Sequence, residues 1–150
     1  MSCGRSRGWL YAGPWFGPRD DLEKRLCPWC IADGSAARAF DASFVDVQDL
    51  VGLPRTRRDE LAHRTPSYTG WQQAEWKTHC DDAMVFVAYA DEAVLREHPE
   101  SLVSLRAEFT AWDDAQFAQL LTLLTIERSP TAYLFRCLHC GLHAAGADFD

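Results

Sequence analysis

Hydrophobic and polar positions recur with two different periods along the chain, and each period predicts a kind of element. Residues 84–90 form a continuous apolar run, which is typical of a buried strand. Between residues 113 and 124 the apolar side chains Phe117, Leu120 and Leu124 stand three or four positions apart, the spacing of one helix face. The chain is therefore expected to contain both strands and helices.

Weaker signals place the remaining elements. Capping residues and prolines bound short helical segments, which are expected at 35–40, 57–64, 70–80, 91–98 and 99–109. Apolar or aromatic segments between turn residues are expected to be strands, at 7–16, 132–136 and 142–145. Strands near both termini with helices between them predict an α+β fold. Because no repeat or linker interrupts the sequence, residues 1–150 are expected to form a single domain.

Length and composition narrow the class of protein. The 150 residues are 47% hydrophobic and 12% aromatic, which is typical of a folded globular chain and not of a disordered one. The longest apolar runs are far shorter than the roughly 20 residues that cross a bilayer. The first five residues also lack the apolar segment of a secretory signal. We therefore expect a cytoplasmic protein without a membrane partner.

The net charge further restricts the partners. The chain has 15 basic and 22 acidic side chains, which gives a formal charge of −7. This balance disfavours binding to nucleic acid or anionic lipid, because both carry the same sign of charge. It suits a basic partner.

The cysteines carry the clearest chemical signal. Two Cys-x-x-Cys pairs, Cys27/Cys30 and Cys137/Cys140, stand far apart in the chain, and Gly141 follows the second pair. Two such pairs can supply the four tetrahedral ligands of a structural zinc ion, and disulfides are not expected in the cytoplasm. The sequence therefore predicts zinc. The candidate ligands are Cys3, Cys27, Cys30, His79, Cys80, Cys137 and Cys140.

Other kinds of chemistry compete with the zinc site as explanations of these residues. The pair Cys27/Cys30 could be a thiol-redox motif, although no buried βαβ pattern precedes it. A nucleophilic role of Cys80 with His79 is disfavoured, because neighbouring residues of a helix point about 100° apart. A segment dense in aromatic and hydrogen-bonding groups could line a ligand pocket or simply form a structural turn. Its candidate residues are Arg64, Tyr68, Trp71, Gln72 and Trp76.

Longer blocks of the sequence resemble the bacterial CbrC family. The most specific block is residues 27–37, with the sequence Cys-Pro-Trp-Cys-Ile-Ala-Asp-Gly-Ser-Ala-Ala. Further matching positions are Arg7-Gly8, Tyr11-Ala12-Gly13-Pro14, Arg64-Thr65-Pro66, Trp71-Gln72, Trp76, His79-Cys80-Asp81, Tyr133-Leu134-Phe135-Arg136-Cys137 and Cys140-Gly141. The resemblance covers nearly the whole chain. It implies an association with tolerance to a nuclease colicin, in a family with no established enzymatic activity.

The chain departs from that family pattern at two places. Family members carry an upstream segment with a Cys-x-x-Cys-Gly knuckle, of which only Cys3-Gly4 is present here, so the chain is expected to lack this segment. Similar members also have a cysteine four residues after Cys80, where this chain has Met84, and a thioether is a poor zinc ligand.

The resemblance implies two four-ligand sites, each of which would keep three thiolates here. The first would use Cys3, Cys27 and Cys30, and the second Cys80, Cys137 and Cys140. A histidine could complete the second site, and the candidates are His79, His139 and His143. The competing arrangement is one closed site made of Cys27, Cys30, Cys137 and Cys140.

Together these observations predict a non-enzymatic, zinc-binding protein. The resemblance implies that it acts in toxin tolerance or immunity by protein binding, with a basic toxin protein as the partner. The alternatives are an enzyme or small-ligand protein with an open zinc site near His79-Cys80, or a thiol-redox protein that uses Cys27 and Cys30.

Overall fold

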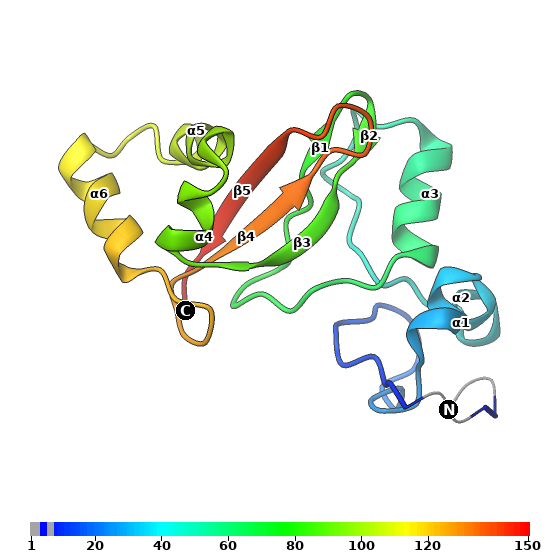
Figure 1. Ribbon diagram of the computed structural model, residues 1–150. Coiled ribbons are helices and arrows are strands. Elements are labelled where there is room, and N and C mark those ends of the chain that lie inside the picture. Colours follow the sequence, from blue (N-terminus) through cyan, green and yellow to red (C-terminus); the bar gives the residue numbers. More distant parts are fainter. Residues whose placement is uncertain (1–3, 6–7) are drawn as a thin grey trace. The chain divides into compact units, whose positions relative to one another are not determined.

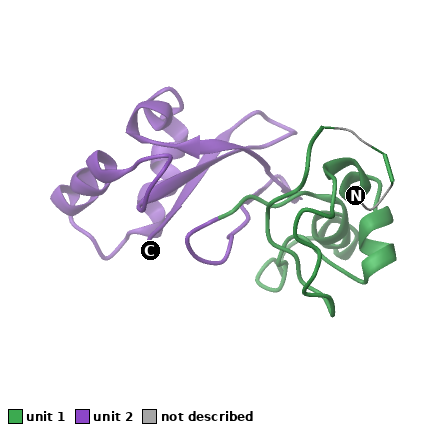
Figure 2. Ribbon diagram, turned by 90° about the horizontal axis from the view of Figure 1, so that it is seen from below, with its two compact units in different colours: residues 1–69 green, residues 70–150 purple. Residues whose placement is uncertain are grey.

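The computed structural model describes residues 4–5 and 8–150, which contain both helices and antiparallel strands (Figure 1). The predicted α+β fold is therefore confirmed. The chain divides into two compact units, residues 1–69 and residues 70–150 (Figure 2), and each has its own buried apolar cluster. The sequence shows no linker near residue 70, and the single domain expected from it stays a prediction.

The first unit contains three short helices. They are α1 (Pro28–Ala32), α2 (Ser35–Phe40) and α3 (Arg55–Arg64). Gly34 separates α1 from α2 with a φ of 74°, a left-handed conformation that glycine adopts without steric cost. The apolar cluster of this unit includes Leu26, Ile31 and Phe44, all of them completely buried.

The strand expected at residues 7–16 is not among the elements of the described residues. Phe16 forms one isolated bridge with Ser43, through two backbone hydrogen bonds of 2.8 Å. Trp9 is 70% exposed, and no strand pairs with the segment before Phe16 within residues 8–150. An aromatic-rich segment without a partner strand has no ladder to join, so the local preference alone does not produce a strand.

The second unit is built on a three-stranded antiparallel sheet. Its strands lie in the order β3 (Val85–Ala90), β4 (Thr131–Arg136) and β5 (His143–Asp148). A separate hairpin of two-residue strands, β1 (Thr78–His79) and β2 (Asp82–Ala83), precedes the sheet. Figure 1 shows this hairpin beside the turn that joins β4 to β5.

Three helices connect β3 to β4, and their apolar side chains join those from one face of the sheet in a buried cluster. They are α4 (Glu92–Arg96), α5 (Pro99–Glu108) and α6 (Asp114–Leu123). Leu95, Leu105 and Leu120 pack with Leu134 and Ala145 in one buried cluster. Phe135, the next residue along β4, points to the opposite face and contacts the indole of Trp76 with ring centroids 5.7 Å apart.

The helix expected at residues 70–80 is wrong. The segment is a loop that ends in β1, because its side chains and backbone are held by contacts with distant residues. The indole N–H of Trp76 donates to the carbonyl oxygen of Met84 at 2.7 Å, and that of Trp71 donates to Thr131 Oγ1 at 2.9 Å. Such tertiary hydrogen bonds outweigh the weak helical preference of the sequence.

The other expected helices and strands end within a few residues of the observed ones, whereas α1, β1 and β2 were not predicted from the sequence. No helix among residues 4–5 and 8–150 has the length and apolar character needed to cross a membrane.

Candidate metal centre

A tight turn of the β1–β2 hairpin positions the first two candidate ligands. His79 pairs with Asp82 across the hairpin, which leaves Cys80 and Asp81 as the two residues of the turn. Both have positive φ, 53° and 56°, as a two-residue hairpin turn of type I′ requires. A left-handed backbone is costly for a residue with a side chain, so the backbone of Cys80 is strained in this turn.

A knuckle between β4 and β5 positions the other two candidate ligands. The N–H of Cys137 donates to the carbonyl of Leu142 at 2.8 Å, and the N–H of Gly141 donates to the carbonyl of Cys137 at 3.1 Å. Gly141 has a φ of 78°, which only glycine adopts readily. The Cys-x-x-Cys-Gly signal in the sequence therefore corresponds to a real turn between two strands.

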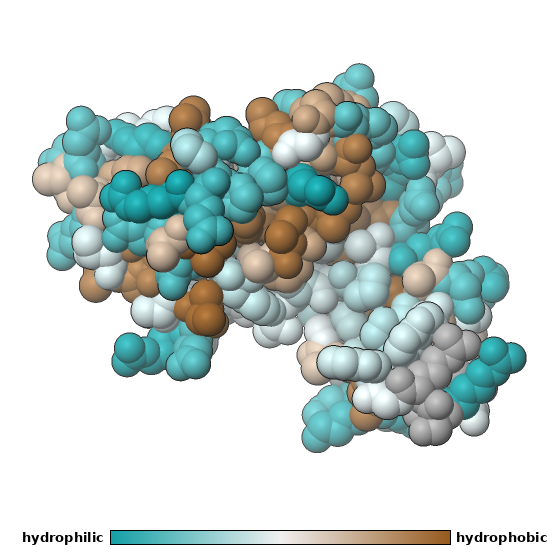
Figure 3. All heavy atoms as spheres, viewed as in Figure 1, coloured by the Kyte–Doolittle hydropathy of each residue, from teal (hydrophilic) through white to brown (hydrophobic). Residues whose placement is uncertain are grey.

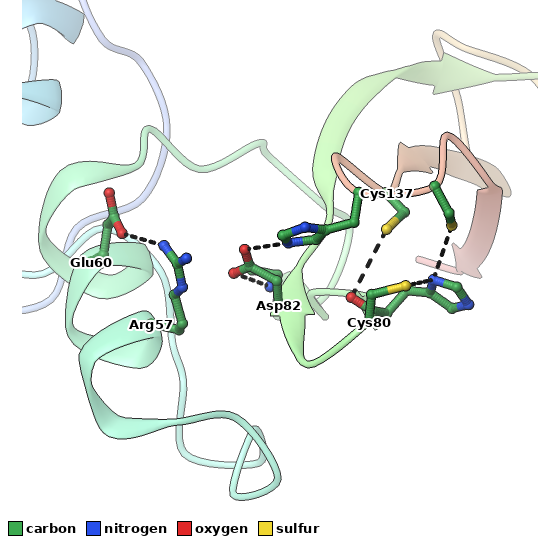
Figure 4. A network of polar contacts seen from close by, with 9 residues as sticks. Arg57, Glu60, Cys80, Asp82 and Cys137 are labelled. Carbon is green, nitrogen blue, oxygen red and sulfur yellow. Dashed lines mark hydrogen bonds and ion pairs between the residues drawn. The ribbon is translucent and has the colours of Figure 1, made fainter.

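The two turns bring four ligand atoms together. The candidate ligand atoms of His79, Cys80, Cys137 and Cys140 all lie within 4.8 Å of one another. His79 Nδ1 is 3.2 Å from Cys80 Sγ and 3.4 Å from Cys140 Sγ. Figure 4 shows Cys80 and Cys137 reaching this cluster from the hairpin and from the knuckle. Ligand atoms around a tetrahedral zinc ion stand about 3.5–3.8 Å apart, so the cluster is close to the size of such a site.

The environment separates the pKa values of two thiols in the cluster. Hydrogen bonding from the backbone N–H of Cys140, assisted by His79, lowers the pKa of Cys137 to about 6. Lost hydration and contacts with the sulfurs of Cys137 and Cys140 raise the pKa of Cys80 to about 11, although the residue as a whole is exposed. At neutral pH the cluster thus holds one thiolate that is ready to bind a metal and one thiol that must first release its proton.

The other two histidines considered for this site lie outside the cluster. His139 Nε2 is 2.9 Å from Asp82 Oδ2, so its ring is turned toward a carboxylate of the hairpin. His143 Nδ1 is 3.0 Å from Glu100 Oε1. Glu100 and its neighbour His98 were not singled out from the sequence, since they stand more than 40 positions before His143 in no recognisable motif.

The remaining cysteines belong to the first unit. Cys27 and Cys30 are buried, and their sulfurs lie 3.1 Å apart around the start of α1. Cys3, the third expected ligand of that site, lies outside the described residues. A metal at this pair therefore stays a prediction. In the second unit, Cys137 and Cys140 have His79 and Cys80 as neighbours.

The candidate ligand pocket is divided between different environments. Arg64 lines an open pocket of about 550 Å³ between α2 and α3, and its Nε donates to the carbonyl of Ala32 at 2.9 Å. Tyr68 and Trp76 are buried. Trp71 and Gln72 are held by hydrogen bonds, and the N–H of Gln72 donates to Asp148 at 3.0 Å. A ligand for this set stays a prediction.

Comparison with known proteins identifies relatives over almost the whole chain. Residues 1–149 match the family described as "Uncharacterised protein family (UPF0167)". UPF0167 proteins of Mycobacterium bovis and Mycobacterium tuberculosis are each 42% identical over 153 residues, which is 99% of this chain and 81% of theirs. A UPF0167 protein of Pseudomonas aeruginosa is 39% identical, over 98% of this chain and 83% of its own. No solved structure matches.

These matches correct the resemblance drawn from the sequence. The family that matches, and the names of the relatives, are UPF0167, so the CbrC label was wrong. The expected role in toxin tolerance came from that resemblance, and the names of the relatives do not support it.

Proposed function

Because the chain belongs to the UPF0167 family, whose description names no activity, we propose a function from the site itself. The chain is a zinc-binding protein, and one ion ties the β1–β2 hairpin to the β4–β5 turn through His79, Cys80, Cys137 and Cys140. The observation that carries the proposal is the placement of these four ligand atoms within 4.8 Å of one another.

The donor set favours zinc over other common ions. Three thiolates and one imidazole form a soft, nitrogen-containing set that suits tetrahedral zinc, whereas magnesium and calcium require oxygen ligands. The low pKa of Cys137 also supports metal binding, because a thiolate is the form that coordinates.

Four protein ligands would make the proposed site structural. A catalytic zinc ion keeps one position for water or substrate, and a closed set of four leaves no such position. The hairpin has only two residues in each strand, too few to be stable alone, so a bound ion would contribute directly to its folding. These points support a non-enzymatic function.

A basic protein is the partner that the charge of the chain favours. The formal charge of −7 would attract such a partner and accelerate its encounter. Three exposed apolar side chains lie near the knuckle: Val85 on β3, which pairs with β4, Leu138 within the knuckle, and Leu142 at its end. On the face seen in Figure 3, apolar groups of the second unit are interspersed with hydrophilic ones, so both kinds of group would be available to a partner. Binding to a basic partner would weaken as salt screens these charges.

The zinc content of purified protein tests the proposal. The native chain and the variants H79Q and C140S would be purified without chelator, and zinc per chain measured by elemental analysis. We expect each variant to hold one zinc fewer than the native chain. H139Q is the matched control, because His139 lies in the same knuckle but outside the cluster, and it is expected to keep the native zinc content.

Two other results would each change the assignment. An H79Q variant that keeps all its zinc would contradict the closed site and favour an ion with an open position. Native protein that contains no zinc and has oxidised thiols would contradict the zinc proposal altogether. It would favour a thiol-redox function of Cys27 and Cys30, whose sulfurs lie 3.1 Å apart.

A further inference from the structure

A second group of metal-ligating side chains lies where α5 begins and β5 begins. His98 is the residue before α5, Glu100 lies in the first turn of α5, and His143 is the first residue of β5. One ligand atom from each of the three lies within 4.8 Å of the others. None of these residues belongs to the cysteine-containing cluster.

Glu100 and His143 are already in direct contact. Glu100 Oε1 is 3.0 Å from His143 Nδ1, and it also accepts a 3.3 Å hydrogen bond from the backbone N–H of His143. Two ligands that bind one ion at about 2.1 Å and at right angles stand about 3.0 Å apart. The separation of these two atoms is therefore one that two adjacent ligands of a single ion can have.

The backbone around the group is held in place by a serine on α5. Ser104 Oγ accepts a 2.7 Å hydrogen bond from the N–H of Ala145, and its own hydroxyl lies 2.9 Å from the carbonyl oxygen of Ser101, so the serine ties α5 to β5. The hydroxyl of Ser101 donates to the carbonyl of His98 at 2.7 Å. These bonds fix the separation between the two chain segments before any ion binds, which lowers the cost of binding.

We propose that His98, Glu100 and His143 form a second metal site, which takes a divalent late transition-metal ion in a nitrogen and oxygen environment. Two imidazoles and one carboxylate are a set that suits Fe(II), Ni(II) or Zn(II) and leaves the remaining positions to water. The site is independent of the zinc cluster, because it shares no ligand with it.

Binding requires one movement. The rings of His98 and His143 are stacked, with centroids 3.9 Å apart and planes inclined by 27°. One ion cannot lie in the planes of both stacked rings, so the half-buried ring of His98 must turn about its Cβ–Cγ bond to direct a nitrogen at the ion. Loss of the stack is therefore a specific signature of the site.

Nickel binding to zinc-loaded full-length protein tests this site separately from the first. Ni(II) would be titrated into the native chain and into H98A, H143A and E100Q, with affinity measured by calorimetry. We expect one Ni(II) per native chain and affinity weaker by about tenfold or more in each variant. H63Q is the control, since His63 lies on α3 with Nδ1 bound to the carbonyl of Asp59, and its affinity is expected to equal that of the native chain.

Spectroscopy distinguishes the two metal sites. Ni(II) bound at the proposed site has no thiolate ligand, so we expect no thiolate-to-nickel charge-transfer band. In a separate NMR titration with diamagnetic Zn(II), we expect the imidazole signals of His98 and His143 to lose their mutual ring-current shifts. The proposal is overturned if Ni(II) binds H98A and H143A as tightly as the native chain. It is also overturned if the stacking of His98 on His143 is unchanged by metal, or if the zinc-loaded chain binds no Ni(II). None of these results bears on zinc at the cysteine cluster, which the elemental analysis tests.

Discussion

Cys80 stands where glycine would suit the backbone better. Its φ of 53° lies in the left-handed region, and the following residue, Asp81, shares that conformation. The side chain at this position is explained by its sulfur, which lies 3.2 Å from His79 Nδ1 in the cluster. Local strain of this kind is retained where a site requires it.

Replacing Cys80 should separate the cost of the turn from the benefit of the ligand. With metal removed by chelator, we expect C80G to be more stable than C80S by about 0.5–1 kcal/mol, because glycine relieves left-handed strain but adds freedom to the unfolded chain. The measurement is the free energy of unfolding in urea. A C80G variant less stable than C80S would show that the turn carries no strain.

The thiols should also make the stability of metal-free protein depend on pH in two opposite ways. The pKa of Cys137 is lowered from 9.0 to about 6, so between these values the unfolded chain binds more protons and stability rises with pH. The pKa of Cys80 is raised from 9.0 to about 11, so between these values the folded chain keeps the extra proton and stability falls with pH.

Urea unfolding of chelated protein against pH would detect both trends. The stability difference between the native chain and C137S should grow from pH 6 to pH 9, and that between the native chain and C80S should shrink from pH 9 to pH 11. Differences that stay flat over both windows would contradict the assignment.

At the residue scale, the sequence placed His79 beside the cysteines as a candidate ligand but left His139 and His143 open as alternatives. The knuckle is a local signal, because Cys137, Cys140 and Gly141 need only each other to form the turn. The choice among three histidines depends on how a distant hairpin is placed against that turn. The same limit hid the group of His98 and Glu100, whose third member lies on another strand.

Among the elements, α6 has the most complete helix start. The Asp113 side chain accepts from the N–H of Gln116 at 2.8 Å, and the Gln116 side chain accepts from the N–H of Asp113 at 2.9 Å. This reciprocal capping box satisfies two backbone donors that no helical carbonyl reaches. It strengthens a helix that the sequence already predicts from the spacing of Phe117, Leu120 and Leu124.

Removing the cap should weaken α6 measurably. We expect D113A to lower the free energy of unfolding by about 1 kcal/mol, because the cap is exposed and its hydrogen bond is the main loss. Chemical unfolding monitored by circular dichroism measures this loss. Q119A, an exposed substitution on the same helix, should stay within about 0.5 kcal/mol of the native chain, and an equal loss in both variants would contradict the capping role.

Elements with strong local signals were predicted well, and elements decided by distant contacts were not. Residues 70–80 have a helical spacing of Trp76 and Cys80, yet hydrogen bonds to residues 131, 148 and 149 hold the segment as a loop. Residues 8–16 have strand composition without a neighbouring strand. In both segments the deciding partners lie elsewhere in the chain, where a local pattern carries no information about them.

On the scale of the molecule, the two units should respond differently to loss of the second-unit metal. All four cluster ligands belong to residues 70–150, which have their own core. We expect H79Q to increase amide hydrogen exchange by about tenfold or more in β1, β2 and the β4–β5 turn, while amides of α3 keep their protection. Mass spectrometry of peptic fragments measures the exchange, with H139Q as the control variant. Equal changes in both units would contradict a local role of the bound metal.

The position of the cluster along the chain has a topological consequence. His79 and Cys140 are 61 positions apart, so an ion bound to both closes a ring that contains the whole sheet except β5, with helices α4, α5 and α6. Closing a loop of this length removes unfolded-state entropy equivalent to about 4 kcal/mol in the simple polymer description. A protease that cuts once inside this ring, for example between α5 and α6, would leave two fragments clasped by the ion. The β3–β4 pairing and the shared apolar core also hold these fragments together. In urea sufficient to disrupt that packing, the ion would be their remaining link, and a chelator would then separate them.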